Sequence, residues 1–162
     1  MTPVNPQILN ALSTGIQSEV ASYVFYIEAA KKSETREFRD VLQKLASEEK
    51  MHFQILEGQH SSLVRSEQWV STADILKRDG LPEIGEDMSQ KHQELIEEVR
   101  NADSIGEILE IAYRLEEEAY ELFDRESRKS PSPEGKKVFA DLAKFEQGHM
   151  TLISEMMKKF GV

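Results

Sequence analysis

Apolar residues recur along four long stretches of the chain with the period of an α-helix. Within each stretch the steps alternate between three and four residues, as in Phe38, Leu42 and Leu45. This spacing gives each helix one apolar face, which is typical of a helical bundle. The pattern predicts helices over residues of about 6–32, 35–64, 104–129 and 136–160. No stretch has the alternation expected of β-strands.

Polar and helix-breaking residues separate the predicted helices. Asn5 followed by Pro6 is a typical helix start, and Ser104 with Glu107 has the spacing of a capping box. The short breaks before residue 35 and over residues 130–135 connect neighbouring helices. Residues 65–103 form a long crossover with room for one short helix over about 89–99. We therefore expect one all-α domain over residues 1–162, a four-helix bundle of two antiparallel hairpins.

Charge and composition exclude several classes of protein. Twenty basic against thirty acidic residues give a net charge of -10, and no basic cluster marks a nucleic-acid interface. No apolar run approaches the roughly 20 residues of a membrane-spanning helix. The chain has no cysteine, so disulfides and cysteine-ligated metals are excluded. Residues 1–6 do not look like a signal peptide, and we expect a cytoplasmic location.

Six ionisable residues occupy the apolar faces of the predicted helices. Polar residues at core positions need a specific explanation. Each of the four helices carries one glutamate of this set, and the second and fourth helices add a histidine three residues later. The six residues are Glu19, Glu49, His52, Glu116, Glu146 and His149.

An internal repeat relates these residues to one another. A shift of 97 positions places Glu19 on Glu116, Glu49 on Glu146 and His52 on His149. In each half the two glutamates are 30 residues apart, and their midpoint falls in the break between the two helices. In an antiparallel pair such residues lie at one height, roughly 22 Å from the turn. Two facing hairpins would therefore bring all six side chains together in mid-bundle.

Four buried glutamates require a source of positive charge. Desolvation and mutual repulsion prevent several carboxylates from staying ionised in an apolar interior without compensation. Two divalent cations would neutralise them, and neutral imidazoles would complete the coordination. Oxygen-rich ligands with one imidazole per metal favour Fe, with Mn as an alternative, over Zn.

The repeat also suggests how the ligands divide. One metal would take Glu19, Glu49 and His52, and the other Glu116, Glu146 and His149, with Glu49 and Glu146 as the expected bridges. The alternative without a metal is that six surface residues fall by chance on the apolar faces of the helices. A third Glu-x-x-His, from Glu57 to His60, has no partner glutamate 30 residues earlier, and we assign it no metal.

Two aromatic residues are candidates for supporting roles. Tyr26 lies seven residues after Glu19 and is the candidate catalytic residue, placed outside the ligands with its hydroxyl bonded to a ligand carboxylate. The alternative is a core tyrosine with no role in chemistry. Because the repeat places Phe123 opposite Tyr26, the two metal environments would differ. Trp69 is expected to pack the crossover onto the bundle.

On these residues the sequence resembles the ferritin-like diiron-carboxylate superfamily, and within it the rubrerythrin group. The resemblance covers the four helices and is carried by Glu19, Tyr26, Glu116 and the two motifs Glu49-Lys50-Met51-His52 and Glu146-Gln147-Gly148-His149. It implies a ferritin-like bundle holding a non-haem diiron centre that reacts with hydrogen peroxide or dioxygen.

The chain departs from that resemblance in two respects. Typical members carry a rubredoxin-like domain with four cysteines, whereas this chain has none, so electrons would come from a separate donor, rubredoxin-like or similar. Typical members also carry a further glutamate three residues after the first one of the third helix. Here that position is Ala119, which puts a movement of iron between ligands in doubt.

The sequence leaves several functions open. The first expectation is a redox enzyme that reduces peroxide or dioxygen. The alternatives are iron oxidation, storage or buffering of the ferritin type, a bundle without a functional metal, and an oxygenase acting on an organic substrate. The chain ends just past the fourth helix, which lowers the expectation of a storage shell. An outer apolar stripe is compatible with a homodimer.

Overall fold

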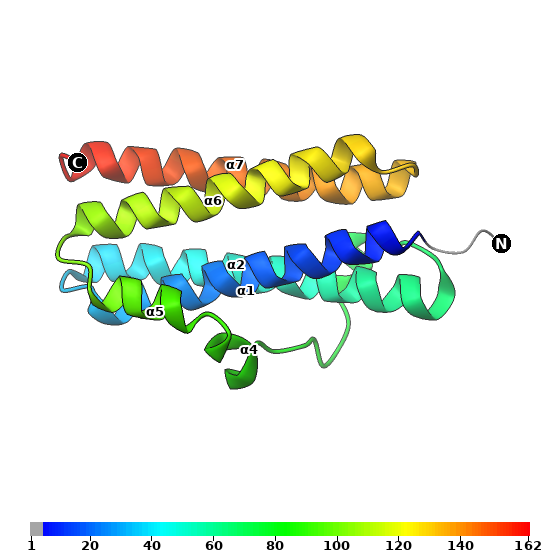
Figure 1. Ribbon diagram of the computed structural model, residues 1–162, viewed down its shortest axis with the longest axis horizontal. Coiled ribbons are helices and arrows are strands. Elements are labelled where there is room, and N and C mark those ends of the chain that lie inside the picture. Colours follow the sequence, from blue (N-terminus) through cyan, green and yellow to red (C-terminus); the bar gives the residue numbers. More distant parts are fainter. Residues whose placement is uncertain (1–4) are drawn as a thin grey trace.

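The computed structural model describes residues 5–162, and within them it contains seven helices and no strand (Figure 1). The all-α prediction is therefore confirmed. Residues 1–4, where we expect no signal peptide, lie outside this description. The helices are α1 (Pro6–Lys32), α2 (Arg36–Ser66), α3 (Thr72–Leu76), α4 (Glu86–Gln90), α5 (Gln93–Arg100), α6 (Ile105–Lys129) and α7 (Pro133–Lys159).

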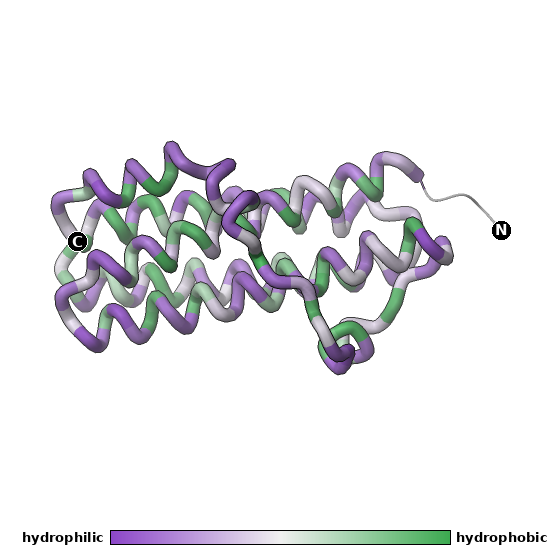
Figure 2. Tube along the Cα trace, turned by 90° about the horizontal axis from the view of Figure 1, so that it is seen from below, coloured by the Kyte–Doolittle hydropathy of each residue, from purple (hydrophilic) through white to green (hydrophobic). Residues whose placement is uncertain are grey.

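The four long helices form the expected ferritin-like bundle of two antiparallel hairpins. Helix α1 packs along α2, α6 packs along α7, and α1 also contacts α6 (Figure 1). Apolar residues line the inside of the bundle while polar residues cover its outside, as the hydropathy colouring of Figure 2 shows. Two clusters of buried apolar residues fill the interior, one toward each end of the helices. The ionisable residues lie between them.

Side-chain caps fix where the long helices begin. Asn5 accepts a hydrogen bond from the backbone of Gln7, and Ser104 accepts one from the backbone of Glu107. The last long helix starts at Pro133, three residues before the predicted start. The prediction treated residues 133–135 as part of the turn. Instead Ser132 caps the helix by accepting a hydrogen bond from Gly135, and proline is favourable in the first turn.

The crossover is more structured than the sequence indicated. It holds three short helices, α3, α4 and α5, where one was predicted. Residues 89–99 do not form one helix, because the chain turns at Lys91 and His92 between α4 and α5. The ring of Trp69 packs edge-on against that of Phe139, with the ring centroids 6.1 Å apart. Trp69 therefore packs the crossover onto the bundle, as predicted. The crossover lies along the α1–α2 hairpin, with α4 and α5 on α1 and α3 on α2.

None of the helices within residues 5–162 is both long enough and apolar enough to cross a membrane.

Candidate metal centre

The six ionisable residues singled out in the sequence meet at mid-bundle. Each of the four long helices contributes one glutamate, and α2 and α7 each add a histidine one turn further along. All four glutamates and His52 are at most 1% exposed, and His149 is 6% exposed. These low exposures exclude the alternative that the six are surface residues.

The side chains form two overlapping groups. The first contains Glu19, Glu49, His52 and Glu146, and in it one ligand atom of each residue lies within 4.8 Å of the others. Glu49, Glu116, Glu146 and His149 form the second group under the same condition. Glu49 and Glu146 belong to both groups, which is the arrangement expected of carboxylates that bridge two metals. The assignment of individual ligands stays a prediction.

Each histidine points its Nδ1 atom into the cluster and reaches the glutamate of the opposite hairpin. The Nδ1 of His52 lies 3.2 Å from Glu146, and the Nδ1 of His149 lies 2.9 Å from Glu49. The two imidazole rings stack with their centroids 5.8 Å apart. The nitrogen that would bind a metal is therefore the one that faces the carboxylates in both halves.

The cluster divides its protons unevenly in the absence of metal. Burial, followed by the charges of Glu146 and Glu49, raises the pKa of Glu19 well above its usual range. Burial also raises the pKa of Glu116, again reinforced by the other two glutamates. Both of these carboxyl groups therefore tend to hold a proton.

The other two glutamates behave in the opposite way. Burial alone would raise the pKa of Glu49, but the neighbouring Glu19 carboxyl group and the two histidines lower it well below its usual range. Burial and the charge of Glu49 would likewise raise the pKa of Glu146, but hydrogen bonds from Glu116 and both histidines lower it to about 2. The shared carboxylates are thus the ionised ones.

The histidines carry the matching positive charge. Burial would lower the pKa of His52, but hydrogen bonds with Glu146 and Glu49 raise it to about 9. The pKa of His149 is raised further, since hydrogen bonds with Glu116, Glu146 and Glu49 outweigh the effect of burial. Two carboxylates and two imidazolium groups leave the metal-free cluster with no net charge.

A model of the Rubrerythrin family matches residues 10–157, which include all six of these residues. The chain belongs to the rubrerythrin family. Neither the comparison with curated proteins nor the comparison with solved structures found a match. Members of the family typically hold a diiron centre, and the buried glutamate and histidine groups described above can hold a metal.

The unpaired atoms of the cluster fit such a centre. Both carboxylate oxygens of Glu19 and one oxygen each of Glu49 and Glu146 are buried without a hydrogen-bond partner in the described part of the chain. A buried polar atom without a partner is costly, so these oxygens need either a proton or a cation. Four carboxylates would balance two divalent cations once both imidazoles are neutral. The donor set of this rubrerythrin-family chain therefore suits two dications.

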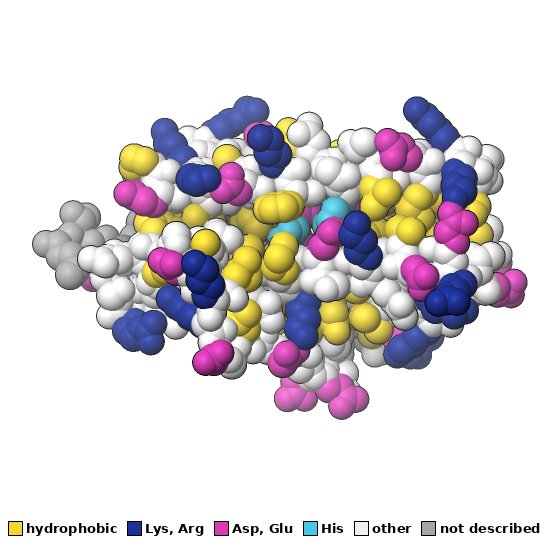
Figure 3. Space-filling model, turned by 180° about the vertical axis from the view of Figure 1, so that it is seen from behind, with side chains coloured by type: hydrophobic (Ala, Val, Ile, Leu, Met, Phe, Trp, Pro, Cys, Tyr) yellow, Lys and Arg dark blue, Asp and Glu magenta, His cyan; other side chains and the backbone are white. Residues whose placement is uncertain are grey.

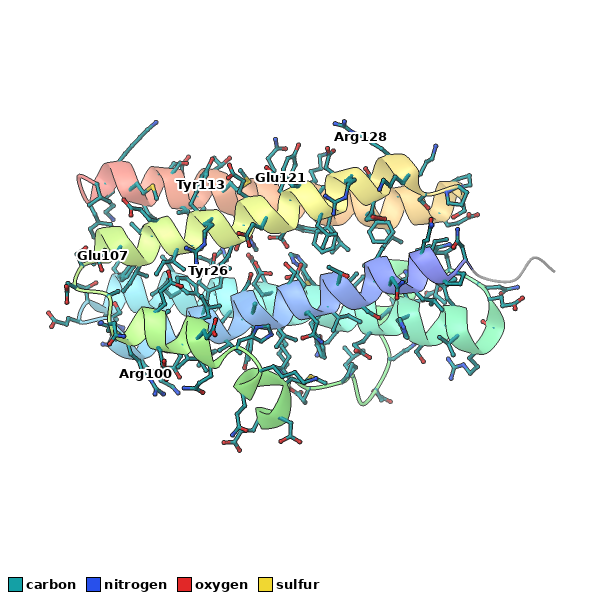
Figure 4. The ribbon with its side chains drawn as sticks, viewed as in Figure 1. Tyr26, Arg100, Glu107, Tyr113, Glu121 and Arg128 are labelled. Atoms are coloured by element: carbon teal, nitrogen blue, oxygen red, sulfur yellow. The ribbon has the colours of Figure 1, made fainter. Side chains whose placement is uncertain are left out.

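Tyr26 takes the supporting position expected of it. Its hydroxyl donates a hydrogen bond of 2.6 Å to Glu116. This bond joins α1, which carries Tyr26 (Figure 4), to α6. Burial and the charge of Glu116 raise the pKa of Tyr26 well above its usual value, so the phenol stays neutral and remains a donor. The contact is made across the two hairpins, to the half that does not contain Tyr26.

Sequence reasoning missed one residue beside the cluster. Glu48 of α2 places a carboxylate oxygen 2.7 Å from Nε2 of His149, on the side of the ring that faces away from the cluster. The repeat carried no signal for this residue, since a shift of 97 pairs Glu48 with Phe145, a polar residue with an apolar one.

Other residues stay outside the two groups. Glu57 and His60 belong to neither group within the described residues, in agreement with the absence of a partner glutamate. Ala119, where relatives are expected to carry a further glutamate, is buried in the apolar core. The site therefore has no carboxylate at that position to exchange for a histidine.

Proposed function

We propose that this protein is a diiron oxidoreductase of rubrerythrin type, which reduces hydrogen peroxide or dioxygen with electrons from a separate donor. The observation that carries the proposal is the pair of overlapping, buried Glu/His groups in a chain of the rubrerythrin family. Glu19, Glu49 and His52 would hold one iron, and Glu116, Glu146 and His149 the other. Glu49 and Glu146 would lie between the two irons.

When bound, two ferrous ions would supply the two electrons needed to convert hydrogen peroxide and two protons into two waters, and the separate donor would replace those electrons. The residues of the chain have other tasks. The four carboxylates would hold the two metals and balance their positive charge. Tyr26 fixes the orientation of Glu116 through its hydrogen bond. The surrounding apolar clusters keep bulk water away from the ligands.

Iron oxidation, storage or buffering of the ferritin type is the alternative function. It would use the same buried ligands, since Glu19, Glu49, Glu116 and Glu146 are at most 1% exposed and ferritin-like sites are built from inward-facing residues of the bundle.

Composition supports the proposal of a separate electron donor. The sequence contains no cysteine, so a cysteine-ligated electron-transfer iron cannot be built from these residues. A rubredoxin-like or similar protein would deliver the electrons. His149 is the most exposed of the proposed ligands, at 6%, and it marks the side from which electrons would enter.

Metal analysis and rapid kinetics test the proposal. Protein purified after iron supplementation should hold about two irons per chain. Anaerobically reduced protein should be oxidised by about one equivalent of peroxide, and the variants Glu49→Ala and His149→Ala should lose this reaction. Retention of a large iron mineral would support storage instead, and failure to bind iron would refute the metal centre altogether.

A further inference from the structure

The two halves of the candidate metal centre differ in what lies behind the histidines. Nε2 of His149 is 2.7 Å from the carboxylate of Glu48, while Nε2 of His52 is buried and has no hydrogen-bond partner within residues 5–162. The ring of Phe145 lies against His52 instead, with the centroids 5.0 Å apart. Helices α2 and α7 thus face each other with a glutamate on one and a phenylalanine on the other.

These two positions are equivalent in the repeat. A shift of 97 residues places Glu48 on Phe145, just as it places His52 on His149. Each residue directly precedes a glutamate of the cluster and contacts the histidine of the opposite helix. Glu48 and Phe145 therefore differ in side chain at matched positions of the repeat.

A carboxylate behind a histidine decides which ring nitrogen carries the proton. When Nε2–H of His149 donates to Glu48, Nδ1 is left with its lone pair, and Nδ1 is the atom that faces the cluster. The bond also holds the ring in the plane needed for ligation. Among the described residues His52 has no such partner at Nε2, and the ring of Phe145 packs against it instead.

The same half gains a second polar contact. Glu116 accepts the hydrogen bond of Tyr26, whereas the repeat mate of Tyr26 is Phe123, whose ring stacks with Phe139 in the apolar core. Both polar partners therefore support the ligands Glu116 and His149. At both matched positions the other half has phenylalanine.

From this asymmetry we propose that Glu48 is a positioning residue for His149 and makes the Glu116–His149 position the tighter of two unequal metal positions. The inference rests on the proposed function, because it assumes that the cluster holds two metals. Partners of this kind typically change metal affinity by about 10- to 100-fold. Metals should therefore bind in two resolved steps, the Glu116–His149 position first.

Glu48 is well placed for mutation because its side chain is 36% exposed, so its replacement leaves no cavity in the core. Figure 3 shows histidine and acidic side chains near one another on one face of the molecule. A matched control is Glu117, which also adjoins a glutamate of the cluster but is exposed and contacts no described histidine. Unfolding curves of each variant would check that the fold is kept.

Titration of the metal-free full chain with Co²⁺ in competition with a chelator is the first experiment. Glu48→Ala should weaken one of the two binding steps by about 10- to 100-fold, while Glu117→Ala should leave both unchanged. Glu48→Gln keeps an acceptor oxygen and should recover most of the loss. Phe145→Glu should strengthen the weaker step. Equal loss from both steps, or none, would overturn the inference.

The second experiment reads the proton position directly. In the Zn²⁺-loaded protein, the ¹⁵N shifts of His149 should report a proton on Nε2, and its exchange with water should quicken in Glu48→Ala. Unchanged exchange would count against Glu48. Failure of the unmodified protein to bind Co²⁺ would refute the proposed function itself, whereas two equal Co²⁺ sites that ignore Glu48 would refute this inference alone.

Discussion

The hydroxyl of Tyr26 on α1 donates a 2.6 Å hydrogen bond to the carboxylate of Glu116 on α6. It is a buried bond between the two hairpins at the level of the cluster, so it couples the position of a proposed ligand to the way the hairpins pack. Removing it leaves a buried carboxylate with one partner fewer.

The variant Tyr26→Phe tests that coupling. Loss of a hydrogen bond to a buried, ionisable acceptor should lower the free energy of unfolding by about 1–3 kcal/mol. Denaturant unfolding of the metal-free protein would measure it. Tyr113→Phe is the control, since Tyr113 is a half-buried tyrosine of α6 for which the structure shows no hydroxyl hydrogen bond. Equal effects of the two substitutions would show that the bond contributes nothing.

Metal binding should exchange protons for cations. Without metal, the raised pKa values of Glu19 and Glu116 keep these two carboxyl groups protonated, and both histidines are protonated as well. Ligation requires all four groups to lose their protons. Because protons and metals compete for the same atoms, affinity should rise with pH through neutrality and through the pKa of His52, about 9.

Calorimetry in buffers of different ionisation enthalpy would count the protons. Near pH 7 the release should be about four protons for two divalent metals, which leaves the cluster neutral before and after binding. The count should fall as the pH approaches 9, where His52 is already losing its proton. Release of no protons at neutral pH would mean that metal binds elsewhere.

The shared carboxylates should matter more than the unshared ones. Glu49 and Glu146 belong to both ligand groups, whereas Glu19 belongs to one. The variant Glu49→Ala should therefore lose both metals, and Glu19→Ala should retain about one per chain. Elemental analysis after dialysis would distinguish them, with Glu57→Ala, from the Glu-x-x-His motif outside both groups, as the control. Retention of one metal by Glu49→Ala would argue against bridging.

The sequence predicted the bundle and the meeting of six residues because both follow from periodicity. Glu19 and Glu49 had to lie at one height once an antiparallel hairpin was assumed, and the repeat extended this to Glu116 and Glu146. The role of Glu48 could not be read in the same way. Its contact with His149 depends on how two helices from different hairpins face each other, which periodicity within one helix does not determine.

The crossover was predicted least well for a related reason. Its helices α3, α4 and α5 have at most eight residues each, too few for a periodic pattern to stand out. They are placed by tertiary contacts, such as the two hydrogen bonds between the side-chain amide of Gln59 and the backbone of Val70. Short helices of this kind are stable only through such contacts.

Lys32 makes the tertiary contacts that hold the end of the crossover that leads into α6. At the end of α1, its Nζ donates to the carbonyl oxygens of Val99, Arg100 and Ala102, where α5 ends. A helix end exposes unpaired carbonyls, and a positive charge there is favourable. Lys32→Met keeps the aliphatic stem and removes all three bonds. It should lower the free energy of unfolding by about 1–3 kcal/mol.

Lys31→Met provides the matched control for that substitution. Lys31 is the neighbouring residue, its side chain is 68% exposed, and it makes only a local ion pair with Glu28. Because exposed ion pairs contribute about 0–1 kcal/mol, this variant should be close to the unmodified protein. Amide hydrogen exchange would localise the effect, since Lys32→Met should speed exchange in α5 without changing α7. Uniform acceleration in both helices would show instead that Lys32 stabilises the bundle as a whole.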